Sequence, residues 1–194
     1  EAFVRAAVST PPAALRQKVA IQVFGRQSAT RIVIPFTDDP SALLAKINEL
    51  RNTQEPLGST DLYGAYLAAV EEVMSQGAGL ELVERSVVIF SDGVHEAGDE
   101  AELRRRALQA KQNRFTSFSV YLGESNDAES ISVLSELASR EENFDVAAAS
   151  DNSNLSTTFE RIARKIYALA RSNYVIGICT PVYRGDNASL TVKL

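Results

Sequence analysis

SVVIFSDG, residues 86–93, is the stretch that decides the fold. Its first part is an apolar run rich in β-branched residues, which is typical of a strand covered on both faces of a sheet. A serine, an aspartate and a glycine follow directly, and this combination favours a turn. The stretch therefore predicts a buried strand over Ser86–Phe90, with the Asp92 carboxylate at its tip.

Outward from this stretch, short apolar runs alternate with longer segments whose apolar residues recur at helical spacing. This alternation is typical of βα units that build a parallel sheet. We therefore predict an α/β fold, with a doubly wound, mostly parallel sheet flanked by helices on both faces. The other expected strands are Val19–Phe24, Arg31–Phe36, Thr116–Leu122 and Phe144–Ala148, and the expected helices cover residues 40–50, 60–74, 99–112, 127–139 and 155–169.

The two ends of the chain carry further elements. Glu1–Val8 has the pattern of a helix already under way. Tyr174–Cys179 and Ser189–Leu194 are two extended runs separated by Pro181 and the turn-forming residues 185–187, which favours a β-hairpin. We expect residues 1–172 to form one domain and residues 173–194 to form a hairpin extension packed on it.

The composition argues against several classes of function. The 194 residues include 20 basic and 25 acidic side chains, for a net charge of −5, which disfavours nucleic acid as a partner. The longest uncharged stretch, residues 172–183, is far shorter than the roughly 20 residues that span a bilayer, so we expect no membrane insertion. The single cysteine, Cys179, lies in an apolar run, where we expect a buried and inert thiol.

The motifs of the common enzyme classes are missing. The sequence contains no phosphate loop of the Gly-Lys type, no dinucleotide-binding glycine turn and no nucleophile elbow. A single histidine excludes a histidine-rich metal hydrolase, and His95 lies in a polar loop where a solvated surface residue is the simplest interpretation. We therefore expect a protein that is not an enzyme.

Two polar loops are candidate sites. Residues 58–61, Gly-Ser-Thr-Asp, precede a predicted helix that starts near Thr60, and residues 91–93, Ser-Asp-Gly, follow the buried strand. Open α/β sheets bind ligands at the edge where their strands end, so we expect Thr60 and Asp92 to face one crevice. The alternatives are a helix cap for the first loop and a simple turn for the second.

In their order along the chain and within the predicted α/β fold, the two loops resemble those of the von Willebrand factor type A (VWA) domain. The resemblance covers residues 1–172. It includes the strand end Val23-Phe24-Gly25, the loop Gly58-Ser59-Thr60 and the strand end Ile89-Phe90-Ser91-Asp92-Gly93. It implies a Rossmann-like VWA fold with a metal-ion-dependent adhesion site, where a protein ligand binds through a divalent cation.

The resemblance further implies that Mg²⁺, or another divalent cation, is held by the Thr60 hydroxyl and the Asp92 carboxylate. Such a hard ion prefers oxygen ligands and keeps several waters, which leaves a position for an Asp or Glu carboxylate of the partner. The hairpin resembles extensions in bacterial envelope proteins, which implies an extracytoplasmic or cell-envelope location and leaves the cytoplasm open. The rim that meets the partner would consist of Ser59, Asp61, Gly93 and His95.

The sequence departs from the family at one point. The family's main metal ligands lie in an Asp-x-Ser-x-Ser motif at the end of its first, central strand, and residues 1–20 contain neither. A sheet without its middle strand leaves buried backbone groups unpaired, at roughly 1–3 kcal/mol each. We therefore expect the strand and the motif upstream of Glu1, or another segment in the place of that strand.

Two other functions stay open. The first is a structural or scaffold domain of the same fold that acts without a metal. The second is a Rossmann-like phosphoryl-transfer enzyme that uses Asp92, which requires a second carboxylate or a lysine beside that residue.

Overall fold

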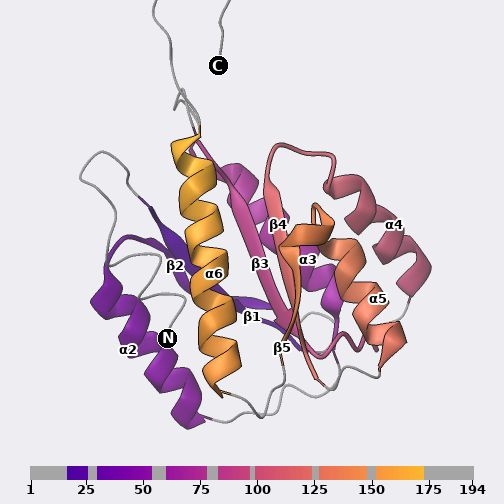
Figure 1. The fold of residues 1–194 in the computed structure, drawn as a ribbon, viewed down its shortest axis with the longest axis horizontal. Coiled ribbons are helices and arrows are strands. Elements are labelled where there is room, and N and C mark those ends of the chain that lie inside the picture. Colours follow the sequence, from indigo (N-terminus) through magenta and orange to yellow (C-terminus); the bar gives the residue numbers. More distant parts are fainter. Residues whose placement is uncertain are drawn as a thin grey trace, which may run out of the picture.

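The structure, a computed structural model, describes residues 17–25, 30–53, 60–77, 83–96, 99–123, 127–147 and 152–172. Strands lie at the centre of the molecule and helices lie on both sides of them (Figure 1). The expected helix tail Glu1–Val8, the expected hairpin after residue 172 and Cys179 lie outside the described residues.

The described strands form two sheets. β1 (Val19–Val23) pairs antiparallel with β2 (Arg31–Thr37). β3 (Ser86–Ser91), β4 (Thr116–Leu122) and β5 (Phe144–Ala147) pair parallel in the order β3-β4-β5. The α/β class is confirmed, although the sheet is small and not fully parallel. A short connection joins β1 to β2, and strands joined in this way pair antiparallel, whereas helices separate the parallel strands.

The helices cover both faces of the strands. α2 (Pro40–Thr53) and α6 (Asn152–Arg171) lie on one face, and α3 (Leu62–Ser75), α4 (Glu100–Ala110) and α5 (Ala128–Leu137) lie on the other (Figure 1). A short 3-10 turn, Glu141–Asn143, leads into β5. None of the helices in the described ranges is long and apolar enough to cross a membrane.

β4 divides the core into two halves because its side chains alternate between the two faces. Phe118 and Val120 are fully buried and pack with Ile162 and Ile166 of α6. Tyr121 belongs to the opposite cluster, which α3, α4 and α5 form over β3. Each face of the strand is therefore covered by its own set of helices, as expected for a strand without a solvated face.

Two buried serines of β4 fix the position of α5. The Ser117 hydroxyl donates to the carbonyl oxygen of Leu137 at 2.6 Å, and the Ser119 hydroxyl donates to that of Leu134 at 2.6 Å. Serine is small enough for the helix to approach closely, and each hydroxyl finds a partner although it is shielded from water. α5 is thus held to the strand by directional bonds at two points one helical turn apart.

α5 begins at an aspartate cap. The Asp127 side chain accepts a hydrogen bond from the backbone N–H of Ser130 at 3.1 Å, which makes Asp127 the N-cap. Hydrogen bonds from Ser130, first from its side chain and then from its backbone, hold the pKa of the Asp127 carboxyl below its usual value of 3.8. The cap therefore favours the ionised carboxylate.

This cap predicts a pH dependence of stability. A depressed folded-state pKa stabilises the protein above pH 3.8, and this contribution is lost as the pH falls through the lower folded value. We expect Asp127→Ala to lower the thermal unfolding midpoint at pH 7, with a smaller difference from wild type at pH 2. Asp127→Asn, which caps without a charge, should differ less from wild type. A deficit of Asp127→Ala that is equal at both pH values would contradict this prediction.

Candidate functional site

The turn at Thr60 and Asp61 joins the ends of the two sheets. The backbone N–H of Asp61 donates to the carbonyl of Gly25, just after β1, at 2.6 Å. The backbone N–H of Glu96, in the loop after β3, donates to the carbonyl of Thr60 at 2.8 Å. The carboxyl ends of β1 and β3 therefore lie at one edge of the molecule, on either side of this turn. This is the edge where open α/β sheets bind ligands.

Asp61 caps α3 and is buried, with 7% of its surface exposed. Its Oδ1 accepts a hydrogen bond from the backbone N–H of Gly64 at 2.9 Å. A Cβ at Gly64 would meet the Asp61 carboxylate, so a larger residue at that position would displace the carboxylate from its present place. The helix starts at Leu62, close to the expected start near Thr60, and Asp61 rather than Thr60 satisfies the first free amides. The Asp61 carboxylate is therefore turned toward the helix.

Removing this cap is expected to destabilise the fold. Asp61→Ala leaves helix amides without a partner, so we expect the free energy of unfolding to fall by about 1 kcal/mol, within a range of roughly 0.5–2. Urea denaturation measures this loss. Asp61→Asn, which retains an acceptor oxygen, should recover most of it. If both variants were as stable as wild type, the cap would contribute nothing.

Asp92 stands at the tip of β3 with an exposed side chain. Its Oδ1 accepts a hydrogen bond from the backbone N–H of Val94 at 3.3 Å and lies 3.4 Å from the Ser91 hydroxyl. Ser91 is buried and its oxygen accepts from the backbone N–H of Gly93 at 3.2 Å. These bonds hold the Asp92 carboxylate at the surface of a tight turn.

Gly93 brings this turn against α5. Its φ of +77° lies in the left-handed region, and a Cβ there would lie 2.5 Å from the carbonyl oxygen of Ser130. Glycine is required by both the backbone conformation and the close approach. The loop after β3 is therefore seated on the first turn of α5.

Gly93→Ala is expected to cost about 1–3 kcal/mol of stability from the left-handed conformation alone, and the clash with the Ser130 carbonyl adds to it. Thermal denaturation measures this loss. Gly77→Ala is a useful comparison, because Gly77 has a similar φ of +76° but its Cβ would meet the flexible side chain of Val83 instead of backbone. If Gly93→Ala were no more destabilising than Gly77→Ala, the contact with Ser130 would not matter.

His95 is half-buried, and the expectation of a solvated surface residue is wrong. Its ring packs edge-on against Tyr63 of α3, with 4.8 Å between the ring centroids and an interplanar angle of 61°. Both ring nitrogens are buried and have no hydrogen-bond partner among the described residues. Tyr63 is fully buried, and burial raises the pKa of its hydroxyl. His95 thus anchors the loop to α3 through an aromatic contact.

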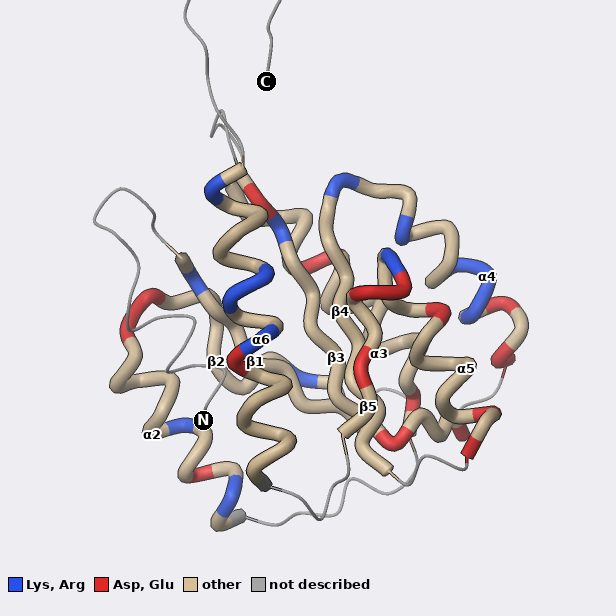
Figure 2. The backbone as a smooth tube through the Cα atoms, viewed as in Figure 1, with Lys and Arg blue, Asp and Glu red and all other residues tan. Residues whose placement is uncertain are grey.

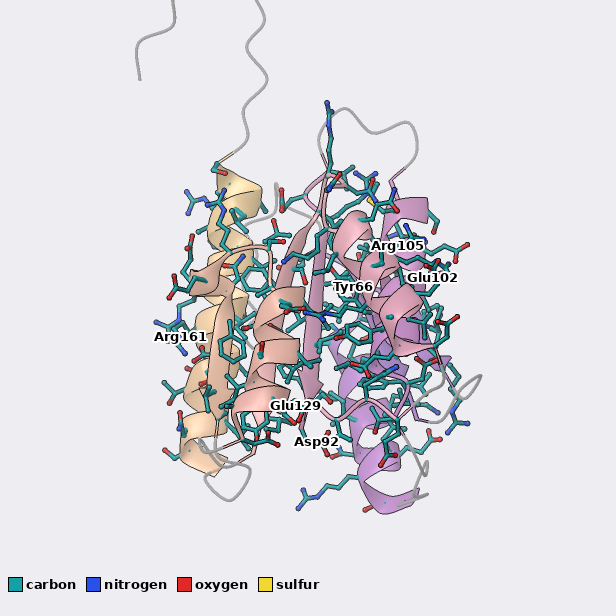
Figure 3. All side chains as sticks on the ribbon, turned by 90° about the vertical axis from the view of Figure 1, so that its right-hand side faces the viewer. Tyr66, Asp92, Glu102, Arg105, Glu129 and Arg161 are labelled. Carbon is teal, nitrogen blue, oxygen red and sulfur yellow. The ribbon has the colours of Figure 1, made fainter. Side chains whose placement is uncertain are left out.

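The first turn of α5 also borders this site, and its contribution was not among the expected site residues. Gly93 touches Ser130, and the neighbouring Glu129 is exposed. Asp92 and Glu129 lie at the same end of the molecule (Figure 3), and Figure 2 shows acidic residues at the start of α5 there. The available signal was the predicted parallel sheet itself, because the helix after β4 begins at the edge where β3 ends.

Comparison with known protein families identifies the family of this chain. The family model of the von Willebrand factor type A domain matches residues 7–161. The chain belongs to the VWA domain family. Domains of this family are generally non-enzymatic adhesion or scaffold modules. Among the curated proteins, none matches this VWA domain.

Solved structures confirm the VWA fold. The vWF domain of the type V pili tip protein Mfa5 from Porphyromonas gingivalis has a TM-score of 0.69 and 14% identity, over 90% of this chain and 88% of that one. BatB from Bacteroides thetaiotaomicron has a TM-score of 0.59 and 15% identity, over 86% and 85% of the two chains. Proximal thread matrix protein 1 from the mussel byssus, with a zinc-occupied MIDAS motif, has a TM-score of 0.59 and 13% identity, over 84% of this chain and 38% of that one.

The hydroxyl of Thr60 and the exposed carboxylate of Asp92 are hard oxygen donors of the kind that Mg²⁺ prefers. In the ranges that the structure describes, no group of three or more His, Cys, Asp or Glu residues could hold a metal ion. Ser59, expected at the rim, lies outside these ranges.

Proposed function

We propose that this VWA domain is a protein-binding module that captures an acidic group of a partner through a divalent cation, Mg²⁺ by preference, at Thr60 and Asp92. The observation that carries the proposal is the hydrogen bond from Glu96 to the Thr60 carbonyl at 2.8 Å. Through it, the loop that presents Asp92 packs on the turn that presents Thr60, at the edge where β1 and β3 end.

The chemistry of these donors supports an open site. Two protein oxygens occupy only part of the six-coordinate shell of Mg²⁺, and water fills the remainder. A partner's Asp or Glu carboxylate can replace one of these waters. Ser59, Asp61, Gly93 and His95 stay our prediction for the rim, with Asp61 acting through the turn that it holds, because its carboxylate caps α3.

The charges around the edge support a dependence on the cation. Glu96, Asp99 and Glu129 are exposed acidic residues on the loops and helix starts of this region. Without a bound cation, this negative potential repels an acidic partner. A divalent ion at Asp92 reverses the local sign of charge, so that binding of an anionic group requires it.

The proposal assigns no catalytic residue, and we propose that the protein is not an enzyme. The alternative within the same fold is a scaffold that acts without a metal.

We also propose a location outside the cytoplasm, associated with the cell envelope. This rests on the pilus-tip protein among the structural neighbours, and on an aerotolerance-related membrane protein from Bacteroides fragilis that shares the fold.

Isothermal titration of the 194-residue chain with MgCl₂ tests the proposal. We expect saturable binding of one ion that EDTA reverses, and weaker binding by Thr60→Val, which removes the hydroxyl and keeps the shape. The matched control is Thr157→Val on α6, whose exposed hydroxyl donates to the Ser153 carbonyl within that helix. Equal heats from wild type and Thr60→Val, or no binding at all, would refute the metal site and leave the scaffold function.

A further inference from the structure

α6 carries a line of basic side chains, which we call the basic stripe. It consists of Arg161, Arg164, Lys165 and Arg171. The last three residues follow the first by three, four and ten positions, so all of them lie on one face of a helix with about 3.6 residues per turn. Figure 2 shows basic residues along α6. The opposite face of the helix, with Ile162 and Ile166, is buried against β4.

The basic stripe is accessible from the solvent. Its three arginines are exposed and Lys165 is half-buried. The exposed fractions of the Arg161 and Arg164 side chains are 50% and 73%. The whole chain has a net charge of −5, so this face differs in sign from the molecule as a whole. A basic face on an acidic protein directs an anionic partner to that face.

Two of the four charges have no anionic partner in the described ranges. The Lys165 ammonium donates to the backbone carbonyl of Glu142, which carries no charge. The Arg171 guanidinium lies over the ring of Tyr167, 5.5 Å from the ring centroid, and this contact does not neutralise its charge. Both charges are therefore available to an anionic ligand.

The other two charges are paired with carboxylates of this chain. Arg164 and Glu160 lie 3.8 Å apart on α6, and both side chains are largely exposed, so this pair contributes little and can exchange for a stronger one. Arg161 forms a salt bridge with Asp145, which ties it to β5. The part of the stripe that is open to a partner therefore extends from Arg164 toward the end of the helix.

Acidic residues border the basic stripe on both sides. Glu160 lies on one side. Asp145 and the turn at Glu142 lie on the other side, where side chains of the stripe contact them. A broad anionic surface, such as a membrane or DNA, brings its negative charges against these carboxylates as well as against the stripe. A single chain segment can lie along the stripe between them, so the arrangement favours a polypeptide with acidic side chains.

We propose that the basic stripe binds an acidic segment of a partner protein. Arg164 and Arg171 are about 10 Å apart along the helix axis, so carboxylates two turns apart on an acidic helix can meet both of them. The planar guanidinium groups suit the two oxygens of a carboxylate. The stripe runs toward the end of the molecule where β3 begins, whereas Asp92 stands where β3 ends (Figure 1). The proposal therefore does not depend on a metal at that site.

Fluorescence anisotropy of a labelled poly-glutamate peptide tests this proposal with the 194-residue chain in EDTA and low salt. We expect saturable binding that weakens as NaCl is added, and no binding of a poly-glutamine peptide of the same length. The double variant Arg164→Gln/Arg171→Gln is expected to bind at least about fivefold more weakly. Its circular dichroism spectrum should match that of wild type, because both side chains contact only α6 among the described residues.

Arg105→Gln/Arg106→Gln is the matched control, since it removes the same charge from exposed positions of α4 on the other face of the sheet. It is expected to change the affinity for the peptide by less than about twofold. Equal weakening by the two double variants would mean that the peptide responds to overall charge alone, and would overturn the proposal. No binding by wild type would overturn it as well.

The choice of metal separates this surface from the proposed metal site, which also takes an acidic group. We expect the peptide to bind equally well in EDTA and in MgCl₂. Binding that requires MgCl₂ would place the peptide at Thr60 and Asp92, and would overturn the present proposal while supporting the proposed function. A chain that binds the peptide in EDTA and binds no Mg²⁺ would have the opposite meaning.

Vesicles that contain phosphatidylglycerol, and a DNA oligonucleotide, test the two broad anionic partners. At protein concentrations that bind the peptide, we expect neither to bind, because the acidic residues beside the stripe repel them. Binding of either one that Arg164→Gln/Arg171→Gln loses would overturn the proposal in favour of that partner.

Discussion

Asp92→Ala is expected to weaken Mg²⁺ binding by more than about tenfold. The reason is that this side chain is the proposed direct or water-mediated ligand, and loss of even an outer partner of a metal ligand costs about 10- to 100-fold in affinity. The Asp92 carboxylate is exposed at the tip of β3, so its removal opens no cavity. It releases only the Val94 N–H and the Ser91 hydroxyl, which are bonded to it at the long distances of 3.3 and 3.4 Å. The fold should therefore persist, and the loss should appear in binding alone.

Calorimetric titration with MgCl₂ measures this effect, and the far-UV circular dichroism spectrum checks the fold. Glu96→Ala is the matched control, since it removes an exposed carboxylate from the same loop while the backbone bond from Glu96 to Thr60 remains. It is expected to change the affinity by less than about threefold, through long-range charge only. If Asp92→Ala and Glu96→Ala weakened binding equally, the ion would be attracted by general negative charge and not held by Asp92.

Phe118→Ala is expected to lower the free energy of unfolding by about 3–5 kcal/mol. Phe118 is fully buried in β4 and packs with Ile162 and Ile166 beneath α6. Its truncation removes apolar contacts and leaves a cavity that a rigid three-stranded sheet cannot close. Because the loss is comparable to the whole stability of many domains, the variant is expected to be partly unfolded at 37 °C.

Urea denaturation at 15 °C measures this loss, because a lower temperature keeps the folded state populated. Phe118→Leu, which keeps most of the volume, should recover more than half of the stability. Leu108→Ala is a surface control, since Leu108 is 36% exposed on α4 and its truncation is expected to change stability by less than about 1 kcal/mol. A small effect of Phe118→Ala would mean that α6 does not depend on this core.

The sequence was sufficient for the elements that have a strong pattern. β3 and β4 are continuous apolar or small-residue runs, and their expected bounds differ from the observed ones by no more than a residue. The direction of β1 against β2 could not be predicted, because a run of apolar residues does not say which neighbour it pairs with. Periodicity describes the faces of a strand, whereas pairing depends on where the connection leads the chain.

The candidate site was predicted in part. The placement of the Thr60 turn and the Asp92 loop at one edge follows from the expected parallel sheet, because the carboxyl ends of parallel strands lie at the same edge. The choice between Thr60 and Asp61 as the cap depends on local geometry, since both residue types can accept from helix amides. The sequence indicates a surface position for His95, because nothing along the chain shows that Tyr63 of another element covers its ring.

The hydrogen bonds of Ser117 and Ser119 distinguish the contact of α5 with the sheet from that of α6. Their two bonds to carbonyls of α5 would both break if that helix slid along β4, so the loop seated on its first turn has a stationary support. α6 packs on apolar side chains of β4. Its polar contacts with β5 include the salt bridge between Arg161 and Asp145. Sliding α5 along β4 would therefore break two buried hydrogen bonds, whereas the contact of α6 with β4 consists of apolar packing without such a direction.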